Sequence, residues 1–436
     1  MFYFIGIKGT GMAALACMLH DLGHEVKGSD LEKHFFTEDP LRERGIEILP
    51  FDAGNIPNGA TVIIGNAFLE DFEEVAAARN NPTVTCFRYH EYLGELIKGY
   101  RSICVAGSHG KTTTTGMMSC MLDQWMPTGY LIGDGTGKIQ KDSENVVVEA
   151  CEFRRHFLAY HPDYAIITNV EIDHVDYFTS EEDYSSAYEE FAENVTGAMA
   201  VFGDDQKARA LNLKGKKVLY YGENSDNDVV AVNVVETSTQ MSFDVMIQGS
   251  LFGHFELPFV GHHLLWNSLG VITIGYLMGL EAVQIEASLS HFGGTKRRFS
   301  IEKCGQNIFV DDYAHHPTEV SVTVDTARKR FPDHKLVAIF KPHRASRVLY
   351  FAQQFADALK KADVVYLCDF TSIDDKQDGT DIDITYLSQM IEGSIILPEN
   401  DEGAMLLAKE EPCVYLFMSS KDIYSLAEKV KRFQNS

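Results

Sequence analysis

Short runs of β-branched and other apolar residues alternate with longer segments of helical periodicity along almost the whole chain. Residues 2–7 predict a strand, residues 11–23 a helix ended by a glycine, and residues 24–30 a second strand. The same alternation starts again at residues 102–107 and once more at 307–312. Strands that alternate with helices are typical of parallel sheets with crossover connections, so the sequence predicts an α/β fold.

A chain of 436 residues is longer than one hydrophobic core comfortably supports, and about 150 residues per domain predicts roughly three domains. We place the boundaries near residues 98 and 296, the second of them just after the pair Gly293-Gly294. The predicted domains are residues 1–98, 99–296 and 297–436.

The balance of charge argues against several classes of partner. Lys and Arg total 38 against 63 for Asp and Glu, a net charge of -25 that repels nucleic acids and anionic membrane surfaces. The eight cysteines lie mostly in apolar runs, for example at Cys104, Cys368 and Cys413, which indicates reduced thiols. The start of the chain shows no secretory leader, and no apolar run approaches 18 residues. We therefore expect a cytoplasmic protein without membrane insertion, a monomer or weak dimer, that acts on small molecules.

The first glycine loop, "GIKGTGM", lies between the first predicted strand and helix, where backbone amides and the helix N-terminus attract phosphate. Its glycines, Gly6, Gly9 and Gly11, depart from the dinucleotide spacing. Lys8 adds a cation beside the expected phosphates, and Asp30 ends the next strand, where it can meet a ribose or another hydroxyl. A tight turn with incidental glycines is the alternative, and a phosphate-bearing ligand is favoured over it.

The second glycine loop, "VAGSHGKTTTT", has two residues between its glycines where the usual phosphate loop has four. An apolar strand precedes it and a helix follows, so the loop amides are placed to cradle phosphates. Lys111, expected as an exposed loop residue, would reach the terminal phosphoryl oxygens, and Thr112 would bind Mg²⁺. A nucleotide loop is favoured over a glycine turn that only resembles one. The expected phosphate-binding residues are Gly107, Ser108, His109, Gly110, Lys111, Thr112 and Thr113.

Acidic groups at the carboxyl ends of neighbouring strands are the expected source of further metal ligands. Glu149 ends the strand "NVVVEA", and Asn169, Glu171, Asp173 and His174 follow the next one. A single histidine in such a loop is more often hydrogen-bonded than a ligand. The gathering of polar groups at one sheet edge reverses that preference, so the sequence predicts a metal site at Thr112, Glu149 and His174.

On a series of ordered segments that extends over nearly the whole chain, this sequence resembles the Mur ligase family. The segments are "GIKGTGM", "GSD", "GSHGKTTTT", "EACE", "TNVEIDH", "GGTKRRF", "DDYAHHPTE" and "FKPHRASR". In that family G-x-x-G-K-[ST] is the ordinary ATP loop. The resemblance implies Rossmann-like N- and C-terminal domains on either side of a central P-loop ATPase domain.

The resemblance also implies a reaction in peptidoglycan precursor synthesis. ATP and Mg²⁺ would convert the carboxylate of UDP-N-acetylmuramate into an acyl phosphate, and the amine of L-alanine would then displace the phosphate. The N-terminal domain would bind the UDP-sugar, and the C-terminal domain would close over the central one with the amino acid.

Individual roles follow from the matched motifs. Lys111 would neutralise the β- and γ-phosphates, Thr112 with Glu149 would hold one Mg²⁺, and His174 would hold a second. Asn267 would meet adenine and Arg298 would approach the nucleotide phosphates. The UDP-sugar residues would be Gly9, Thr10, Gly11 and Asp30, and the amino-acid residues Tyr313, His315, His343, Arg344 and Arg347. The expected catalytic residues are Lys111, His174, Arg298, His315, Arg344 and Arg347.

Plainer interpretations stay open for some of these residues. Arg297 and Arg298 would then only anchor a linker, and residues 315–317 would be a helix start with a solvated histidine.

The sequence departs from the family pattern in three places. Leu264 stands where H-N-x-x-N has its first asparagine, residues 419–422 read "SSKD" instead of "GAGD", and the acidic segment 371–383 is unusual. These departures leave open a murein-peptide ligase or a divergent paralogue that uses a different amine. An NAD-binding oxidoreductase or nucleotide-sensing module is a third alternative, which rests on the first glycine loop and Asp30 alone.

Overall fold

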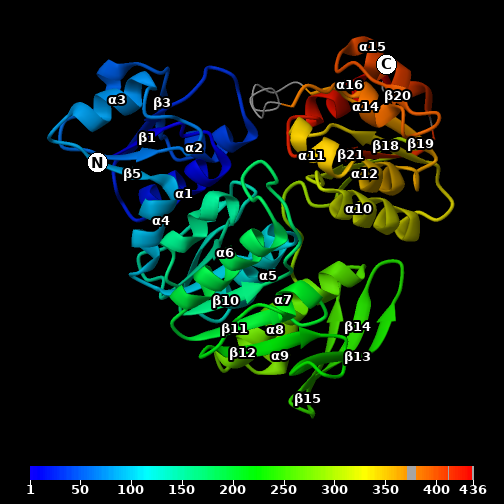
Figure 1. Ribbon diagram of the computed structural model, residues 1–436, viewed down its shortest axis with the longest axis horizontal. Coiled ribbons are helices and arrows are strands. Elements are labelled where there is room, and N and C mark those ends of the chain that lie inside the picture. Colours follow the sequence, from blue (N-terminus) through cyan, green and yellow to red (C-terminus); the bar gives the residue numbers. More distant parts are fainter. Residues whose placement is uncertain (371–379, 411, 435–436) are drawn as a thin grey trace.

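In the computed structural model, the described residues are 1–370, 380–410 and 412–434, so most of the acidic segment 371–383 lies outside them. Within these ranges the chain forms three α/β units, each around its own sheet (Figure 1). The N-terminal unit (blue) and the C-terminal unit (yellow to red) both lie above the central unit (cyan to green). The predicted α/β fold class is confirmed.

The N-terminal unit has a parallel five-stranded sheet of order β3-β2-β1-β4-β5, counted in residues 1–98, all of which are described. Phe2 of the central strand pairs with Val26 and with Thr61, and this strand is buried along its length because helices cover both faces. The strands are β1 (Phe2–Ile5), β2 (Val26–Ser29), β3 (Glu47–Leu49), β4 (Thr61–Ile64) and β5 (Thr85–Arg88). The helices are α1 (Thr10–Asp21), α2 (Asp39–Glu43), α3 (Glu73–Asn80) and α4 (Tyr89–Ile97), with the 3-10 turns η1 (Phe36–Glu38) and η2 (Ala53–Asn55).

The central unit has a ten-stranded sheet of order β15-β14-β13-β12-β11-β10-β6-β9-β7-β8, within residues that are described throughout. Its middle is parallel, and both ends turn antiparallel. The strands are β6 (Arg101–Ala106), β7 (Thr128–Leu131), β8 (Gly137–Lys138), β9 (Asn145–Glu149), β10 (Tyr164–Ile167), β11 (Ala198–Phe202), β12 (Lys217–Gly222), β13 (Val229–Glu236), β14 (Met241–Ile247) and β15 (Ser250–Leu257). The helices are α5 (Lys111–Asp123), α6 (Glu181–Asn194), α7 (Gln206–Arg209), α8 (His262–Leu277) and α9 (Ala282–Leu289), with the 3-10 segment η3 (Phe153–Ala159).

Helix α5 forms despite a run of four threonines, which are poor helix formers because their side chains are β-branched. All four are buried, and the Thr115 hydroxyl donates to the Lys111 carbonyl at 2.8 Å. Packing against α8 and the sheet, rather than local propensity, therefore holds this helix in place behind the glycine loop.

The C-terminal unit has a sheet of order β16-β17-β21-β18-β19-β20 in its described part, parallel except for β16 against β17. The edge strand β20 has only two residues. The strands are β16 (Ser300–Cys304), β17 (Asn307–Asp312), β18 (Leu336–Phe340), β19 (Val364–Leu367), β20 (Ile395–Ile396) and β21 (Val414–Met418). The helices are α10 (Pro317–Arg330), α11 (Ala345–Tyr350), α12 (Ala352–Leu359), α14 (Thr385–Ser388), α15 (Asp401–Leu407) and α16 (Tyr424–Gln434), with the 3-10 turn η4 (Ala408–Glu410).

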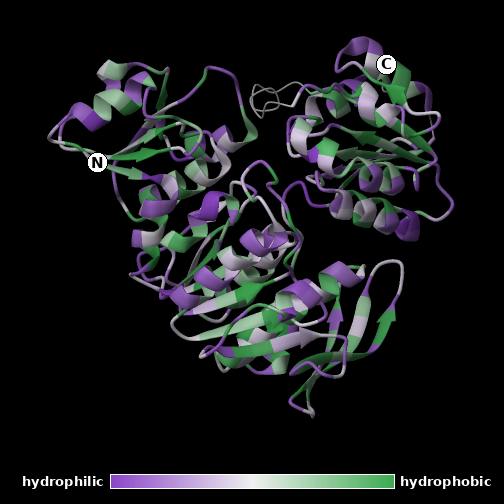
Figure 2. Ribbon diagram, viewed as in Figure 1, coloured by the Kyte–Doolittle hydropathy of each residue, from purple (hydrophilic) through white to green (hydrophobic). Residues whose placement is uncertain are grey.

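Figure 2 shows apolar strands at the centre of each unit and polar stretches on the outward helices. Among the helices of the described chain, none combines the length and the apolar character that crossing a bilayer requires. The connections that contain residues 98 and 296 follow α4 and α9, and the domain boundaries placed there stay predictions.

Candidate active site

The glycine loop leaves β6 at Ala106 and enters α5 at Lys111, so it lies at the carboxyl edge of the central sheet. Gly107 has a φ of 136° and a side chain there would meet the Thr168 hydroxyl, while Gly110 has a φ of 80° and packs against the Asn267 amide. Only glycine tolerates both the backbone conformation and the close approach. The loop is thereby fixed at the N-terminus of α5, where helix amides attract anions.

Lys111 differs from the expectation of an exposed loop residue. It is the first residue of α5, and its side chain is only 12% exposed. The ammonium lies 3.0 Å from a Glu152 carboxylate oxygen and donates to the Ser108 carbonyl at 3.0 Å. Burial lowers the pKa of Lys111, but the carboxylate of Glu152 outweighs it and raises the pKa above the usual value. The lysine is therefore a buried cation, and the expectation of exposure was wrong because Glu152 holds it inside.

Two of the predicted metal ligands meet directly. The Thr112 hydroxyl donates to Glu149 at 2.8 Å, and the Gly133 amide donates to the same carboxylate at 3.0 Å. A hydroxyl and a carboxylate at the mouth of a phosphate loop are hard oxygen donors of the kind that Mg²⁺ prefers. The donor chemistry of this pair fits the expected cation.

His174 lies apart from that pair, beside Glu152, with 3.8 Å between Nε2 and the nearer carboxylate oxygen. Its backbone has a φ of 51°, and its Nδ1 is buried without a hydrogen-bond partner among the described residues. Burial lowers the pKa of His174 to about 3, so the ring is neutral and keeps a lone pair for a cation. Glu152 thus contacts both Lys111 and His174. The sequence predicted no role for Glu152, although this residue lies in the matched segment "EACE".

A cavity of about 1110 Å³ opens beside the loop between the central unit and α10. Asn267, which is 7% exposed, reaches it from α8, and Leu264 lines it one turn earlier on the same helix. The predicted nucleotide residues that line the cavity are His109, Gly110, Thr113, Asn267 and Arg298. The structure therefore brings the expected adenine-side and phosphate-side residues to one space.

The two arginines of the linker have different partners. Arg297 binds Asp311 at 3.3 Å and the carbonyls of Ser419 and Lys421 at 2.7 and 3.0 Å, as an anchor of the chain would. Arg298 turns toward the loop instead, donates to the Thr112 hydroxyl at 3.3 Å and lies 3.6 Å from Glu319. The linker-anchor interpretation thus describes Arg297, while Arg298 reaches the predicted phosphate site.

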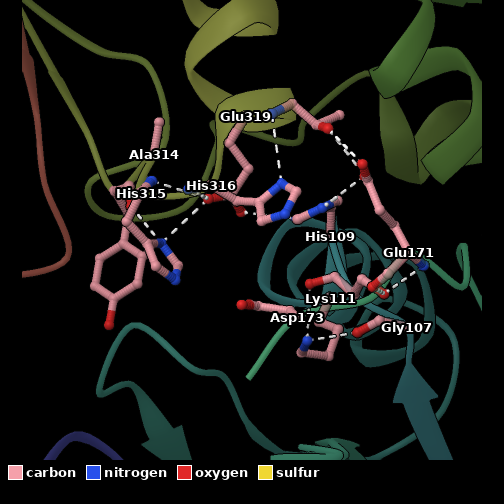
Figure 3. A network of polar contacts seen from close by, with 12 residues as sticks. Gly107, His109, Lys111, Glu171, Asp173, Ala314, His315, His316 and Glu319 are labelled. Carbon is pink, nitrogen blue, oxygen red and sulfur yellow. Dashed lines mark hydrogen bonds and ion pairs between the residues drawn. The ribbon is translucent and has the colours of Figure 1, made fainter. Parts of the chain in front are cut away.

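His109 connects the glycine loop to the C-terminal unit (Figure 3). Its Nε2 lies 3.0 Å from Glu171 and its Nδ1 lies 3.4 Å from Glu319 on α10. The Thr318 hydroxyl donates to Glu171 at 2.8 Å from the same end of α10. Burial alone would lower the pKa of His109, but Glu171 and Glu319 raise it to about 9. This cationic ring between two carboxylates forms an ionic contact between the two units, and Glu319 and Thr318 were not among the predicted residues.

His109, Glu171 and His316 also place three potential metal-ligand atoms within 4.8 Å of one another. Glu171 and Glu319 raise the pKa of His109 to about 9, so the ring is protonated on both nitrogens at neutral pH, although Nδ1 makes no hydrogen bond among the described residues. Nδ1 of His316 accepts from the Thr318 amide at 3.4 Å, which places the proton of its neutral ring on Nε2. A metal ligand needs a free nitrogen lone pair, so the protonation pattern favours an ion-paired contact over a cation site.

The contact through His109 predicts a pH dependence of stability. A pKa raised from about 6.5 to about 9 means that the folded chain binds the proton more tightly, so the stabilisation is complete below pH 6.5 and is lost as the pH rises through 9. We expect the melting temperature to fall between pH 6.5 and 9.5 at fixed ionic strength, and to fall less in His109→Gln. The exposed His161→Gln is the control and keeps the wild-type slope. Identical slopes in all three proteins would contradict the role of His109.

The residues predicted for the amino acid gather at the edge of the C-terminal sheet that faces the central unit. His315 Nδ1 lies 3.1 Å from Glu319, and His343 Nδ1 lies 3.1 Å from the Ser420 hydroxyl. The ring of Tyr313 lies 5.0 Å from the guanidinium carbon of Arg298. His315 begins the turn before α10, as the plainer interpretation expected, but it is part-buried rather than solvated.

The two arginines of this group bind carboxylates of the central unit. Arg347 is 2% exposed, and its guanidinium contacts Asp173 at 2.8 and 2.9 Å. Arg344 pairs with Asp176. Both acids follow β10, so two ion pairs join the C-terminal unit to the segment that carries His174.

In the N-terminal unit, Gly9 caps α1, and a side chain at Gly11 would collide with the Tyr89 hydroxyl. Asp30 is 9% exposed, and its two oxygens accept from the Lys8 and Leu31 amides at 2.7 Å, so it holds the loop together. Lys8 is not beside an open phosphate position as expected, since its ammonium lies 2.7 Å from Glu38 and is buried.

The N-terminal glycine loop faces the central unit. A side chain at Gly135 would lie 3.6 Å from the Thr10 methyl group, and one at Gly137 would collide with the Ala14 backbone. Residues 133–137 therefore pass between α1 and Glu149. The Gly133 amide donates a hydrogen bond to the Glu149 carboxylate. The predicted UDP-sugar loop and the predicted metal pair lie on two sides of one turn.

Comparisons with known proteins give a consistent result over the whole chain. Residues 1–101 match "Mur ligase family, catalytic domain", residues 105–275 match "Mur ligase middle domain", and residues 297–404 match "Mur ligase, glutamate ligase domain". The crystal structure of the UDP-N-acetylmuramate-alanine ligase MurC from Thermotoga maritima is 27% identical, with a TM-score of 0.83 over 100% of this chain and 99% of that one.

Two further structures share the fold at lower identity. A murein peptide ligase from Psychrobacter arcticus has a TM-score of 0.76 and 22% identity over 100% of this chain and 99% of its own. A MurF ligase from Thermotoga maritima in complex with ADP has a TM-score of 0.68 and 16% identity over 88% of this chain and 97% of its own.

Proposed function

This chain belongs to the Mur ligase family of ATP-dependent ligases, and we propose that it joins L-alanine to the carboxylate of UDP-N-acetylmuramate. The observation that carries the proposal is the end-to-end similarity to an alanine-adding ligase, combined with two arginines of the C-terminal unit that bind Asp173 and Asp176 on either side of His174. The site residues remain proposals, assigned from the geometry described above.

In the proposed first step, a carboxylate oxygen of the sugar acid attacks the γ-phosphorus of ATP. The new O–P bond forms as the bond to ADP breaks, which gives an acyl phosphate. In the second step the amine nitrogen attacks the acyl carbon, inorganic phosphate leaves, and the nitrogen loses a proton to give the amide. Positioning and charge neutralisation supply most of the rate of such phosphoryl transfers.

The residues of this chain have distinct parts in those steps. Lys111 and the amides at the start of α5 hold negative charge on the phosphates, and Arg298 adds a second cation from the linker. The planar guanidinium groups of Arg344 and Arg347 are suited to a two-point contact with the carboxylate of the amino acid. Thr112, Glu149 and His174 would hold Mg²⁺, which neutralises charge on the phosphoryl oxygens when bound.

A phosphate-release assay tests the proposal directly. With UDP-N-acetylmuramate, ATP and Mg²⁺ present, we expect L-alanine to stimulate phosphate release, and glycine, L-serine and a tripeptide to give less than about a tenth of that rate. Omission of the sugar acid is the control and should abolish the stimulation. Phosphate release that requires the sugar acid but does not increase with L-alanine would overturn the choice of L-alanine as the amine.

A murein-peptide ligase is the second candidate, favoured by full-length similarity to such an enzyme and by the unusual residues 419–421. Ser420 contacts His343 in the predicted amine site, so these residues bear on amine choice. Stimulation by a tripeptide rather than by L-alanine would select this candidate. The nicotinamide alternative loses its support, because all three units match domains of the Mur ligase family.

A further inference from the structure

The strand that carries Glu149 is followed by a backbone turn of unusual strain. Within η3, Arg154 has φ and ψ of 51° and 26°, and Arg155 has 58° and 27°. Residues other than glycine rarely adopt this left-handed backbone conformation. Two such residues in succession keep it only where surrounding contacts impose it. Strain of this kind concentrates at sites where a side chain must be presented in a fixed direction.

The residues on both sides of Arg154 are firmly anchored. Arg155 binds Asp183 at 2.8 Å and Glu190 at 2.6 Å on α6. Phe157 is fully buried and stacks on Phe191 of the same helix, with 4.7 Å between the ring centres. Arg154 itself is exposed and forms no ion pair with a carboxylate in the described part of the chain. Within the described ranges, the strained turn therefore presents one guanidinium group without a carboxylate partner.

That guanidinium lies where the three units meet. Its central carbon is 5.3 Å from the ring centre of Phe153, and the guanidinium carbon of Arg344, from the C-terminal unit, is also 5.3 Å from the same ring. The ring of His174 lies 4.6 Å from Phe153. Two residues after Arg154, Nδ1 of His156 contacts the Asn66 amide of the N-terminal unit at 3.2 Å.

Charge distinguishes Arg154 from its neighbours. Arg344 is balanced by Asp176, and Lys111 by Glu152, whereas Arg154 brings a positive charge to the same junction and has no carboxylate partner among the described residues. In the proposed function an acid substrate would extend from the N-terminal unit to the phosphate loop, and residues 153–156 contact both Asn66 of the N-terminal unit and His174. A carboxylate there would contact a guanidinium in two-point fashion.

We propose that Arg154 binds the reacting carboxylate of the acid substrate and stays with it as the acyl phosphate forms, with Phe153, whose ring also contacts Arg344 and His174, as the platform for its guanidinium. This inference rests on the proposed function, since it assigns a further residue to that reaction. The contact places positive charge where the carboxylate and the γ-phosphate, both negative, must approach each other.

Steady-state kinetics of Arg154→Ala test the proposal. We expect the KM for UDP-N-acetylmuramate to rise about tenfold or more, and the KM values for ATP and L-alanine to change less than about twofold. Arg154→Lys should lower this KM part of the way back, because lysine keeps the positive charge but lacks the planar guanidinium that makes a two-point contact. Arg328→Ala removes an exposed guanidinium that is paired with Asp363, and should leave all three KM values unchanged.

Arg154→Gly separates binding from a structural role. Glycine adopts the left-handed conformation without strain, so we expect the melting temperature to stay level or rise while the KM for the sugar acid rises as in Arg154→Ala. A variant with an unchanged KM for the sugar acid would overturn the proposal, and so would a parallel rise in all three KM values. A wild-type protein that does not use UDP-N-acetylmuramate would instead refute the proposed function.

Calorimetric titration of the wild type and of Arg154→Ala with the sugar acid, without ATP, gives a second readout. We expect weaker binding by Arg154→Ala, and equal affinities would also overturn the inference.

Discussion

Replacement of Lys111 by alanine is expected to reduce amine-dependent phosphate release by about 10³-fold, because the ammonium neutralises charge that develops on the transferred phosphoryl group. The loss should appear in kcat more than in the KM for L-alanine. Lys98→Ala, which removes an exposed lysine paired with Glu95, is the control and should keep wild-type turnover. Near-normal release by Lys111→Ala would remove the glycine loop from the nucleotide site.

The same substitution should also affect stability, because Lys111 is held inside by Glu152. Without the ammonium, Glu152 is a buried carboxyl group with an unpaired charge, and such a change costs about 3 kcal/mol of the free energy of unfolding. In the double variant Lys111→Ala/Glu152→Gln the stability should recover while turnover stays low. Thermal unfolding and phosphate release on the three proteins separate the two effects. Recovery of turnover along with stability would show that the lysine acts only on the fold.

Arg347→Ala is expected to raise the KM for L-alanine by about 10²-fold, with less than about a threefold change in the KM for ATP, because the guanidinium offers a two-point contact to the amino-acid carboxylate. It should also lower the free energy of unfolding by about 3 kcal/mol, since Asp173 would remain buried and unpaired. The measurements are steady-state kinetics with each substrate varied, and chemical denaturation.

Two matched variants make the result for Arg347 specific. Arg347→Met/Asp173→Asn removes both charges, so stability should return while the KM for L-alanine remains high. Arg328→Ala breaks an exposed pair with Asp363 and should cost less than about 1 kcal/mol without a kinetic effect. Equal increases in the KM values for ATP and L-alanine would remove Arg347 from the amine site.

Local patterns in the sequence predicted much of the fold. The strands that lead into the two glycine loops, β1 and β6, begin and end within about two residues of their expected limits, since each is a short apolar run bounded by glycine or polar residues. The antiparallel strands β13, β14 and β15 were missed. Their signal was present in β14, where Met241, Phe243, Val245 and Ile247 alternate with less buried residues and pack in the central core.

The partners of the site residues were beyond local patterns. Asp173 and Arg347 are 174 positions apart, and His109 meets Glu319 across two units of the fold. Nothing in a single sequence fixes such distances, because they depend on how complete domains pack. For the same reason, the burial of Lys111 and Lys8 could not be inferred from loops that read as open turns.

The ion pairs of Arg344 with Asp176 and of Arg347 with Asp173 give the proposed amino-acid site an internal competitor for its ligand. An amino acid that reaches these arginines would displace one carboxylate with another, so its net binding free energy would be smaller than the new contacts alone provide. Binding of the amino acid would then be readily reversed. Such a balance would keep occupancy responsive to the supply of free amino acid and would leave the finished amide easy to release.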